Sequence, residues 1–340
     1  MRWALVPLAM VLGLVGVASC QAAPSNSSAR SVVDAPLPAD VQGTLTYQRD
    51  GNIYVLPLTS KQERKLTDFP PAAPAVFSAR APDGSRLAYV RQEGLGSALY
   101  LANSDGGDAR KLLDVSEAGA TLEWLQWTPS GDALLYTYHG FLMEGTRILG
   151  ELFRAERLDV AGGSPTVVVE DAEGPTMAST GAIAFVRTTR TGQQLVVREP
   201  EGSERVLVPE RSFTSLAAPR FSHDGRRVAF VAVGEGPQVG AAAPSWALDP
   251  RHALAALRAG LAPPVALAHG EPWDIWLAEL GGGVRRVNKL GEDEPTVAWS
   301  ADDRYLAVSG GTGVYVLDVA SGQATQLTKV GGFGGIDWTP

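Results

Sequence analysis

The residue types that could support metal binding or acid–base catalysis are few, and most of them fall in two stretches, 139–148 and 234–272. His139, His252 and His269 lie in or beside these stretches. Their spacing lacks the short intervals at which histidines share one metal ion, so no metal site is expected. Carboxylates of the same region could form the pair that glycoside hydrolysis needs, about 5–10 Å apart. These carboxylates are Glu144, Glu151, Glu271 and Asp274.

Several well-defined catalytic signatures are missing. The sequence has no G-x-S-x-G nucleophile elbow, no P-loop and no G-x-G-x-x-G that opens the helix of a βαβ unit. The single Cys excludes a disulfide framework and a thiolate zinc site. The sequence therefore assigns no catalytic residue and no cofactor.

Composition limits the class of protein further. The chain has 340 residues, of which 45% are hydrophobic and 19% charged, so it can bury a large core and is not a disordered chain. Its formal net charge is −8 and its pI about 5.1, which argues against binding nucleic acid or anionic lipid through a basic surface.

The N-terminus has the pattern of a secretory signal peptide. Arg2 precedes an apolar run over residues 3–17, which is shorter than the ~20 residues of a membrane-spanning helix. Small residues close the run in the order Val17-Ala18-Ser19-Cys20. Residues 1–19 are therefore predicted to be removed, with an ordinary cleaved signal and an unmodified Cys20 as the alternative.

Residues 17–20 closely resemble the bacterial lipobox, and the only Cys of the chain stands where that resemblance requires it. The resemblance implies that the Cys20 thiol carries diacylglycerol and that Cys20 becomes the first residue. Acyl chains would then hold the protein on a membrane of the bacterial cell envelope, on the extracytoplasmic side. Residues 20–42, rich in Ala, Pro, Ser and Asn, are predicted to form the lipidated Cys and a flexible tether.

The remainder, residues 43–340, repeats one unit. A turn followed by an apolar, aromatic strand recurs at intervals of about 45 residues. The turns are Asp83-Gly84, Ser130-Gly131, Thr180-Gly181, Asp224-Gly225 and, without the Gly, Asp302-Asp303. Each unit is predicted to contain four short antiparallel strands, named a to d from the axis outward. Six such units predict an all-β fold, a six-bladed β-propeller.

The ends of this region indicate how the ring closes. The first unit begins at a strand b, residues 44–47, and has no strand a of its own. Residues 336–338 have the composition of a strand a and no further unit behind them. The two segments are therefore predicted to pair and complete one blade.

Three of the turns lie in degenerate copies of a W-S-P-D-G repeat. The copies are Phe221-Ser222-His223-Asp224-Gly225, Trp299-Ser300-Ala301-Asp302-Asp303 and Trp127-Thr128-Pro129-Ser130-Gly131. This repeat resembles that of TolB-type propellers and of the propeller domain of prolyl oligopeptidases. The resemblance covers residues 43–340 and implies the fold, whereas the N-terminal helical domain of TolB is missing. His223, which stands where the repeat has Pro, is expected to be solvated.

Strand direction predicts two faces. The a–b and c–d turns share one face, called the a–b face, and the b–c turns and d–a connections share the other, the b–c face. Both long stretches fall on the b–c face: residues 139–148 as a long b–c connection of blade 3, and residues 234–272 as an insertion of blade 5 with a capped helix near 251–259. The candidate binding residues on this face are His139, Phe141, Glu144, Arg147, Trp246, Arg251, His252 and Trp273.

Two functions follow from this pattern. The first is a lipid-anchored, non-catalytic propeller that binds a protein partner or a small ligand at the b–c face, with the membrane as a second partner through Cys20. The second is an extracytoplasmic hydrolase or lyase for a carbohydrate-type substrate, with its site at the channel mouth. Fold alone does not separate them.

Overall fold

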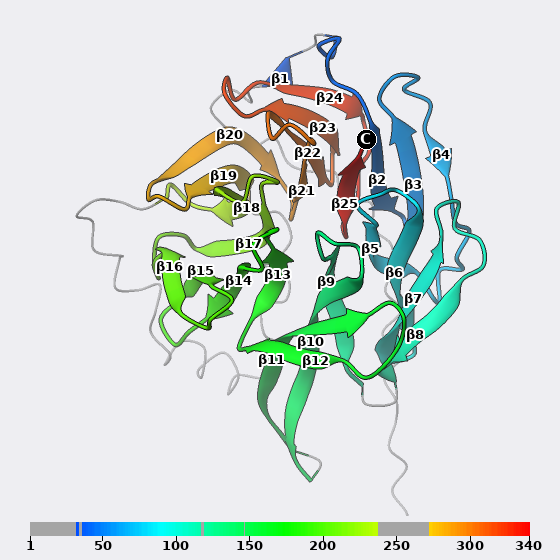
Figure 1. The fold of residues 1–340 in the computed structure, drawn as a ribbon, viewed down its shortest axis with the longest axis vertical. Coiled ribbons are helices and arrows are strands. Elements are labelled where there is room, and N and C mark those ends of the chain that lie inside the picture. The colour runs from blue at the N-terminus through cyan, green and yellow to red at the C-terminus, as the bar shows by residue number, and fades with distance from the viewer. Residues whose placement is uncertain (1–31, 34–35, 117–118, 146, 237–271) are drawn as a thin grey trace, which may run out of the picture.

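The computed structural model describes residues 32–33, 36–116, 119–145, 147–236 and 272–340. Six antiparallel sheets surround a central axis, as Figure 1 shows. The described residues contain no α-helix, and so none that is long and apolar enough to cross a membrane. Cys20 lies outside these residues, as do residues 237–271 with their predicted helix. The fold is therefore the predicted all-β, six-bladed propeller.

Each blade contributes four strands, which follow one another from the axis outward. Blade 1 contains β25 (Ile336–Thr339), β2 (Thr44–Arg49), β3 (Asn52–Pro57) and β4 (Arg64–Lys65). Blade 2 contains β5 (Ala75–Arg80), β6 (Arg86–Glu93), β7 (Gly96–Asn103) and β8 (Arg110–Asp114). Blade 3 contains β9 (Thr121–Trp127), β10 (Ala133–Glu144), β11 (Arg147–Asp159) and β12 (Thr166–Glu170).

The other three blades follow the same order. Blade 4 contains β13 (Glu173–Met177), β14 (Ile183–Thr188), β15 (Gln193–Arg198) and β16 (Glu204–Val208). Blade 5 contains β17 (Ser215–Phe221), β18 (Arg227–Val233), β19 (Trp273–Glu279) and β20 (Val284–Glu292). Blade 6 contains β21 (Thr296–Trp299), β22 (Tyr305–Gly310), β23 (Gly313–Asp318) and β24 (Ala324–Thr328).

The last strand closes the ring. β25 pairs antiparallel with β2, with Ile336 opposite Tyr47 and Trp338 opposite Leu45. Ile336 and Tyr47 are completely buried. The pairing joins the two ends of the repeat region, as the sequence predicts.

Repeated side chains build both the turns and the core. Gly84, Gly131 and Gly225 have φ angles of 72°, 69° and 68°, a region that glycine adopts without a steric cost. Each strand b carries one aromatic side chain that is almost completely buried, because neighbouring blades cover both of its faces. In blades 2 to 5 these side chains are Tyr89, Tyr136, Phe185 and Phe230.

Part of the predicted tether contacts the propeller. β1 (Val32–Val33) adds a parallel fifth strand beside β24 of blade 6. Asp40 forms an ion pair of 2.6 Å with Arg304, and the backbone carbonyl of Gln42 accepts a hydrogen bond of 2.8 Å from the Trp338 indole. Within the predicted tether 20–42, the described residues therefore lie against blades 6 and 1.

The blade-3 connection differs from the predicted loop. β10 and β11 continue as a hairpin, paired from Ala133–Asp159 to Glu144–Arg147, and project beyond the blades at the bottom of Figure 1. Gly145, with a φ of 62°, lies in the tight turn at its tip. The two strands stay paired through this segment, so residues 139–145 and 147–148 form a β-arm.

Candidate functional site

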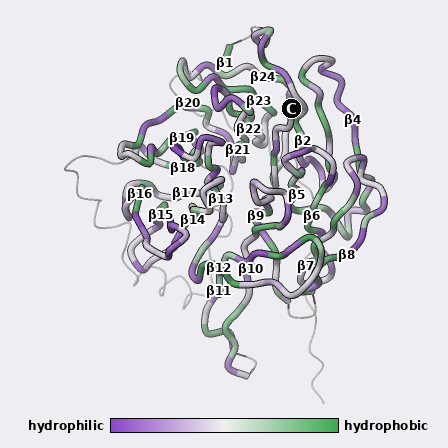
Figure 2. Tube along the Cα trace, in the orientation of Figure 1, coloured by the Kyte–Doolittle hydropathy of each residue, from purple (hydrophilic) through white to green (hydrophobic). Residues whose placement is uncertain are grey.

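The two faces of the propeller carry different side chains. Ten large apolar side chains are exposed in the described part of the chain, and eight of them lie on the b–c face. The eight are Leu95, Phe141, Leu142, Met143, Ile148, Leu149, Val330 and Phe333. The other two, Val167 and Val206, lie on the outer strands of blades 3 and 4. Figure 2 shows hydrophobic stretches along the projecting hairpin, so the b–c face is the candidate interaction face.

A pocket of about 460 Å³ opens on the b–c face where blades 3 to 6 approach one another. Its walls are mostly apolar, with Trp124 and Trp273 among the lining residues and with Glu173 and Glu294 as the ionisable groups. None of the described residues that line it is Lys, Arg or His. The volume is within the range of small-molecule sites.

A second hollow of about 600 Å³ adjoins this pocket near the axis and shares Trp124 and Glu294 with it. Phe77 and Phe333 contribute to its walls, and Asp50 is its other acidic residue. It too has no basic group among the described lining residues. The two hollows form one acidic and aromatic region around the mouth of the channel.

Trp124 lies between the two hollows in an unusual backbone conformation. Its φ is 53°, a region that costs about 1–3 kcal/mol for a residue other than glycine. A β-bulge interrupts the pairing of β9 with β10 at this point. A Cβ at Gly174 of blade 4 would lie 3.8 Å from Cγ of Trp124 and only 3.1 Å from Cδ of Pro219. The bulge thus places Trp124 at both hollows, and Gly174 leaves room for Pro219.

A cluster of ionisable groups borders the pocket between blades 3 and 4. His139 on β10 lies 2.9 Å from Glu123 on β9, between its Nδ1 and Oε1, and 4.0 Å from Glu151 on β11, between its Nε2 and Oε1. The hydrogen bond with Glu123 is the main cause of the raised pKa of His139, and partial burial opposes it. The His139 ring also stacks on Phe153, with 4.2 Å between centroids.

Glu173 connects this cluster to the pocket. Burial is the main cause of its raised pKa; a hydrogen bond of 2.9 Å from the Thr188 hydroxyl and the nearby His139 oppose the shift. The negative charges of Glu123 and Glu151 raise the pKa of Glu173 further. Glu173 is thus a carboxyl group that the fold holds in an unfavourable environment at the wall of a cavity, a property typical of functional sites.

The structure places the predicted site residues in different parts of the molecule. His139 lies in the ionisable cluster, and Trp273, which is 8% exposed, lines the pocket. Phe141, Glu144 and Arg147 lie on the exposed hairpin arm. Trp246, Arg251 and His252 lie outside the described residues, as does Glu271. Asp274 is buried and pairs with Arg286 at 3.2 Å, so it is not part of the pocket.

Sequence reasoning missed Glu123, Trp124 and Glu173. Glu123-Trp124 and Glu173-Gly174 occupy equivalent positions on β9 and β13, just before the bulge of each innermost strand. Aligning the starts of strands a would have shown that these two glutamates share a position. The turns and long loops, on which the prediction rested, do not contain this information.

The opposite end of the channel contains a completed polar network. Arg220 on β17 reaches across β21 to β25, where it lies 3.5 Å from Asp337 and donates hydrogen bonds to the carbonyls of Val297 and Ile336. The side chains of Arg220 and Asp337 are only 18% and 14% exposed. Asp337 also accepts a hydrogen bond of 2.8 Å from the amide of Arg80. One ion pair therefore joins blades 5 and 1, with a neighbouring bond to blade 2.

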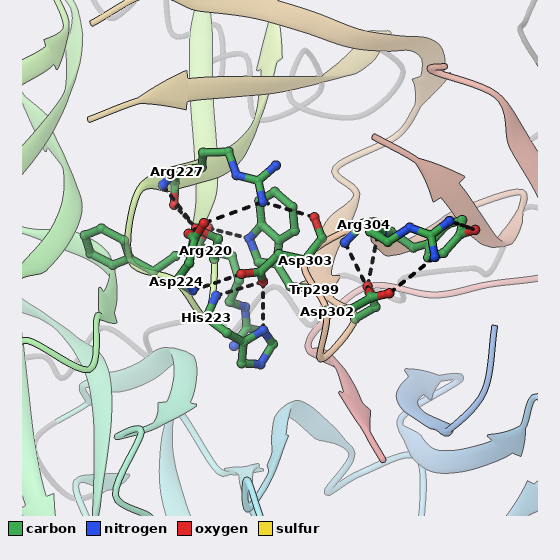
Figure 3. A network of polar contacts seen from close by, with 12 residues as sticks. Arg220, His223, Asp224, Arg227, Trp299, Asp302, Asp303 and Arg304 are labelled. Carbon is green, nitrogen blue, oxygen red and sulfur yellow. Dashed lines mark hydrogen bonds and ion pairs between the residues drawn. The ribbon is translucent and has the colours of Figure 1, made fainter. Parts of the chain in front are cut away.

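The neighbouring a–b turns of blades 5 and 6 are joined by a carboxylate, as Figure 3 shows. Asp303, with a φ of 56°, stands where the other repeats have glycine. It accepts hydrogen bonds of 2.8 Å and 2.9 Å from the amides of His223 and Asp224, and its Oδ1 lies 2.9 Å from Nδ1 of His223. The His223 side chain is 56% exposed, but its Nδ1 is hydrogen-bonded rather than simply solvated. Asp303 thus stands in the place of the glycine, and its hydrogen bonds link the two turns.

Comparison with known proteins supports the fold only. No family model and no curated protein matches the sequence. Among solved structures, TolB from Acinetobacter baumannii matches with a TM-score of 0.64 at 16% identity, over 89% of this chain and 68% of TolB. A chain of a nidogen/laminin complex matches with a TM-score of 0.59 at 12% identity, over 88% of this chain and 98% of that one.

Hydrazine synthase from Kuenenia stuttgartiensis also contains a similar region, with a TM-score of 0.55 at 14% identity, over 85% of this chain and 44% of that one. These proteins have unrelated activities, and identities this low carry no residue roles from one to another. The chain therefore has a TolB-like six-bladed β-propeller fold, and its function has to be argued from its own side chains.

Proposed function

We propose that this protein is an extracytoplasmic, lipid-anchored propeller that binds a protein partner through its b–c face and has no chemistry of its own. One observation carries the proposal: eight of the ten exposed large apolar side chains lie on this face in the described part of the chain. Large exposed apolar patches on a soluble domain mark interaction sites.

The hairpin arm contributes five of these side chains. β9 pairs with β10 only as far as His139, and β12 pairs with β11 only from Arg154. Beyond these points the arm is a two-stranded ribbon with no further strand on either edge among the described residues. Such a ribbon is marginally stable in water unless it is packed or extended, so contact with a partner would stabilise it.

The described part of the N-terminal segment contacts blade 6. β1 begins beside Ala324, at the end of β24 next to the c–d turn, and Asp40 contacts the a–b turn of blade 6 through Arg304.

The test of the partner face is a variant of the arm. Leu142→Ser, Met143→Ser and Ile148→Ser combined should abolish crosslinking to the partner identified by mass spectrometry with the wild type. Val167→Ser and Val206→Ser, which change exposed apolar groups on the outer strands, form the matched control and should keep the crosslink. Retention of the same crosslink in the arm variant would reject the b–c face as the docking surface.

The anchor has a separate test. Cys20→Ser should move the protein from the membrane fraction to the soluble fraction and remove the acyl mass from its N-terminal peptide, because only this thiol can carry the lipid. A wild-type protein that is soluble and lacks the acyl mass would reject the anchor and leave the partner face untouched.

A hydrolase or lyase for a carbohydrate-type substrate is the second candidate, favoured by the geometry of His139. A histidine oriented by a carboxylate at 2.9 Å, with a second carboxylate at 4.0 Å, has the arrangement of a general base or acid. Incubation with a panel of polysaccharides should then release reducing ends or unsaturated products, and His139→Gln should remove this activity. Absence of any product with the wild type would reject the enzyme.

A further inference from the structure

We propose that the pocket lined by Trp124, Glu173 and Trp273 binds an organic cation, a protonated amine or guanidinium carried on an apolar body. The inference rests on the proposed function, because it names the chemical group that the b–c face recognises. The same chemistry is offered by a free amine and by a Lys or Arg side chain of a protein partner, and binding measurements with the two kinds of probe separate these sources.

The first argument is charge. The pocket and the adjoining hollow contain Glu173 and Glu294, and no described lining residue is basic; Asp50 of the hollow has Arg49 at 3.9 Å as its partner. The hollow at the other end of the channel has the opposite character, since Arg80, Arg220 and His223 line it together with Asp337. A ligand that enters from the b–c face therefore meets negative charge, which favours a cation and disfavours a carboxylate or phosphate.

The second argument is the combination of aromatic and apolar walls. Trp124 and Trp273 line the pocket, and most of the remaining wall is aliphatic. The face of an indole attracts a cation, and it also covers the apolar part of the ligand. Sites that recognise alkylammonium groups combine aromatic side chains with carboxylates for this reason.

The third argument is that the ionised carboxylate of Glu173 has few favourable partners within the protein. Among the described residues it receives one hydrogen bond, from Thr188 on β14, and it shares its surroundings with Glu123 on β9, His139 on β10 and Glu151 on β11. Burial raises its pKa, so the fold alone favours the protonated form. A bound cation would favour the ionised form and lower this pKa again.

The probes are phenethylammonium chloride and its neutral analogue 2-phenylethanol, with Nα-acetyl-lysine methylamide as the side-chain source. Calorimetry with the propeller should give at least about 10-fold tighter binding of the ammonium than of the alcohol. Tighter binding of the lysine derivative assigns the pocket to a partner side chain, and tighter binding of phenethylammonium assigns it to a free amine. Equal binding of the cation and the alcohol, or binding of neither cation, overturns the proposal.

The variants are Glu173→Gln and the control Glu170→Gln, which removes the same charge from the exposed outer strand β12 of blade 3. Glu173→Gln should weaken cation binding at least about 10-fold. Glu170→Gln should leave the affinity unchanged. An unchanged affinity in Glu173→Gln with an intact melting curve overturns the proposal.

The outcomes separate this inference from the proposed function. Loss of the partner crosslink in the arm variant with no cation bound by the wild type supports the partner face and rejects the cation pocket. Cation binding together with a crosslink that survives the arm variant supports the pocket and rejects the arm as the docking surface.

Discussion

Asp303 on the a–b face and Glu173 on the b–c face are both partly buried carboxylates, and the fold treats them in opposite ways. Burial tends to raise the pKa of Asp303, but hydrogen bonds from the His223 side chain and from the amides of His223 and Asp224 outweigh it, so its pKa is lowered. Glu173 has one hydrogen bond and two neighbouring glutamates, so burial prevails and its pKa is raised. The ionised carboxylate of Asp303 therefore stabilises the folded protein, whereas that of Glu173 destabilises it.

A raised pKa alone does not distinguish the two ends, because burial also raises the pKa of Asp337 at the a–b end. The ends differ in how far the protein itself pairs the buried carboxylate. The polar groups of the a–b face find their partners inside the protein, at Arg220–Asp337 and at His223–Asp303. The b–c face has a bulged Trp124 at positive φ, a carboxyl group with a raised pKa and an apolar arm. Proteins accept such local instability mainly where function requires it.

The largest effect is expected from removing the strand that closes the ring. Truncation after Gly334 deletes β25 and exposes the edge of β2, which invites aggregation. Burial of Ile336 is worth roughly 2–3 kcal/mol, and the partly buried Trp338 adds to it, against a total of about 5–15 kcal/mol. The truncated protein should be insoluble or melt more than about 10 °C lower by circular dichroism. Deletion of the exposed Pro340 alone is the control and should leave the melting temperature unchanged.

The second effect concerns the ion pair at the a–b end of the channel. Asp337→Ala leaves Arg220 without its counter-charge and should lower the free energy of unfolding by about 3 kcal/mol. Adding Arg220→Met should restore part of this loss, because an unpaired buried charge costs more than an apolar side chain of similar length. Urea denaturation measures both variants. A double variant less stable than Asp337→Ala would show that the hydrogen bonds of Arg220 matter more than its charge.

The third effect is the pH dependence of Asp303. Asp303→Asn tolerates the same backbone conformation but weakens the bonds to His223 and Asp224, so it should cost about 1 kcal/mol at pH 7. Because folding lowers the pKa of Asp303, its stabilisation is present above the unfolded pKa of ~3.9 and is lost as the pH falls. Melting curves of wild type and variant should therefore differ above about pH 5 and converge only as the pH falls below ~3.9 and through the lower folded pKa of Asp303. A gap that persists in acid would show that the charge is unimportant.

The smallest expected effect is a gain in stability rather than a loss. Glu173→Gln should raise the melting temperature at pH 7 by about 1–3 °C, because it replaces a carboxylate that burial destabilises. Folding raises the pKa of Glu173, so the wild type regains stability as the pH falls toward the unfolded pKa of ~4.3 and the gain from the variant should disappear there. A variant less stable than wild type at pH 7 would contradict the contrast between the faces.

Much of the scaffold follows from the order of residues. The turns at Gly84, Gly131 and Gly225 and the buried aromatic residue of each strand b are local patterns, so their recurrence predicts the blades and the pairing of residues 336–338 with 44–47. The prediction of a loop over residues 139–148 is wrong: β10 and β11 stay paired as far as Glu144 and Arg147, although the consecutive apolar residues 141–143 show no strand alternation.

The candidate site depended on contacts that no local pattern contains. The sequence by itself determined a propeller with two unequal faces, because turns, strand periodicity and repeat length act over a few residues. Only the tertiary structure brought Trp124, Glu173 and Trp273 from three different blades to one pocket, and only there did burial raise the pKa of Glu173. Burial and electrostatic shifts depend on everything that surrounds a group in space, and in a propeller most of those neighbours come from other repeats.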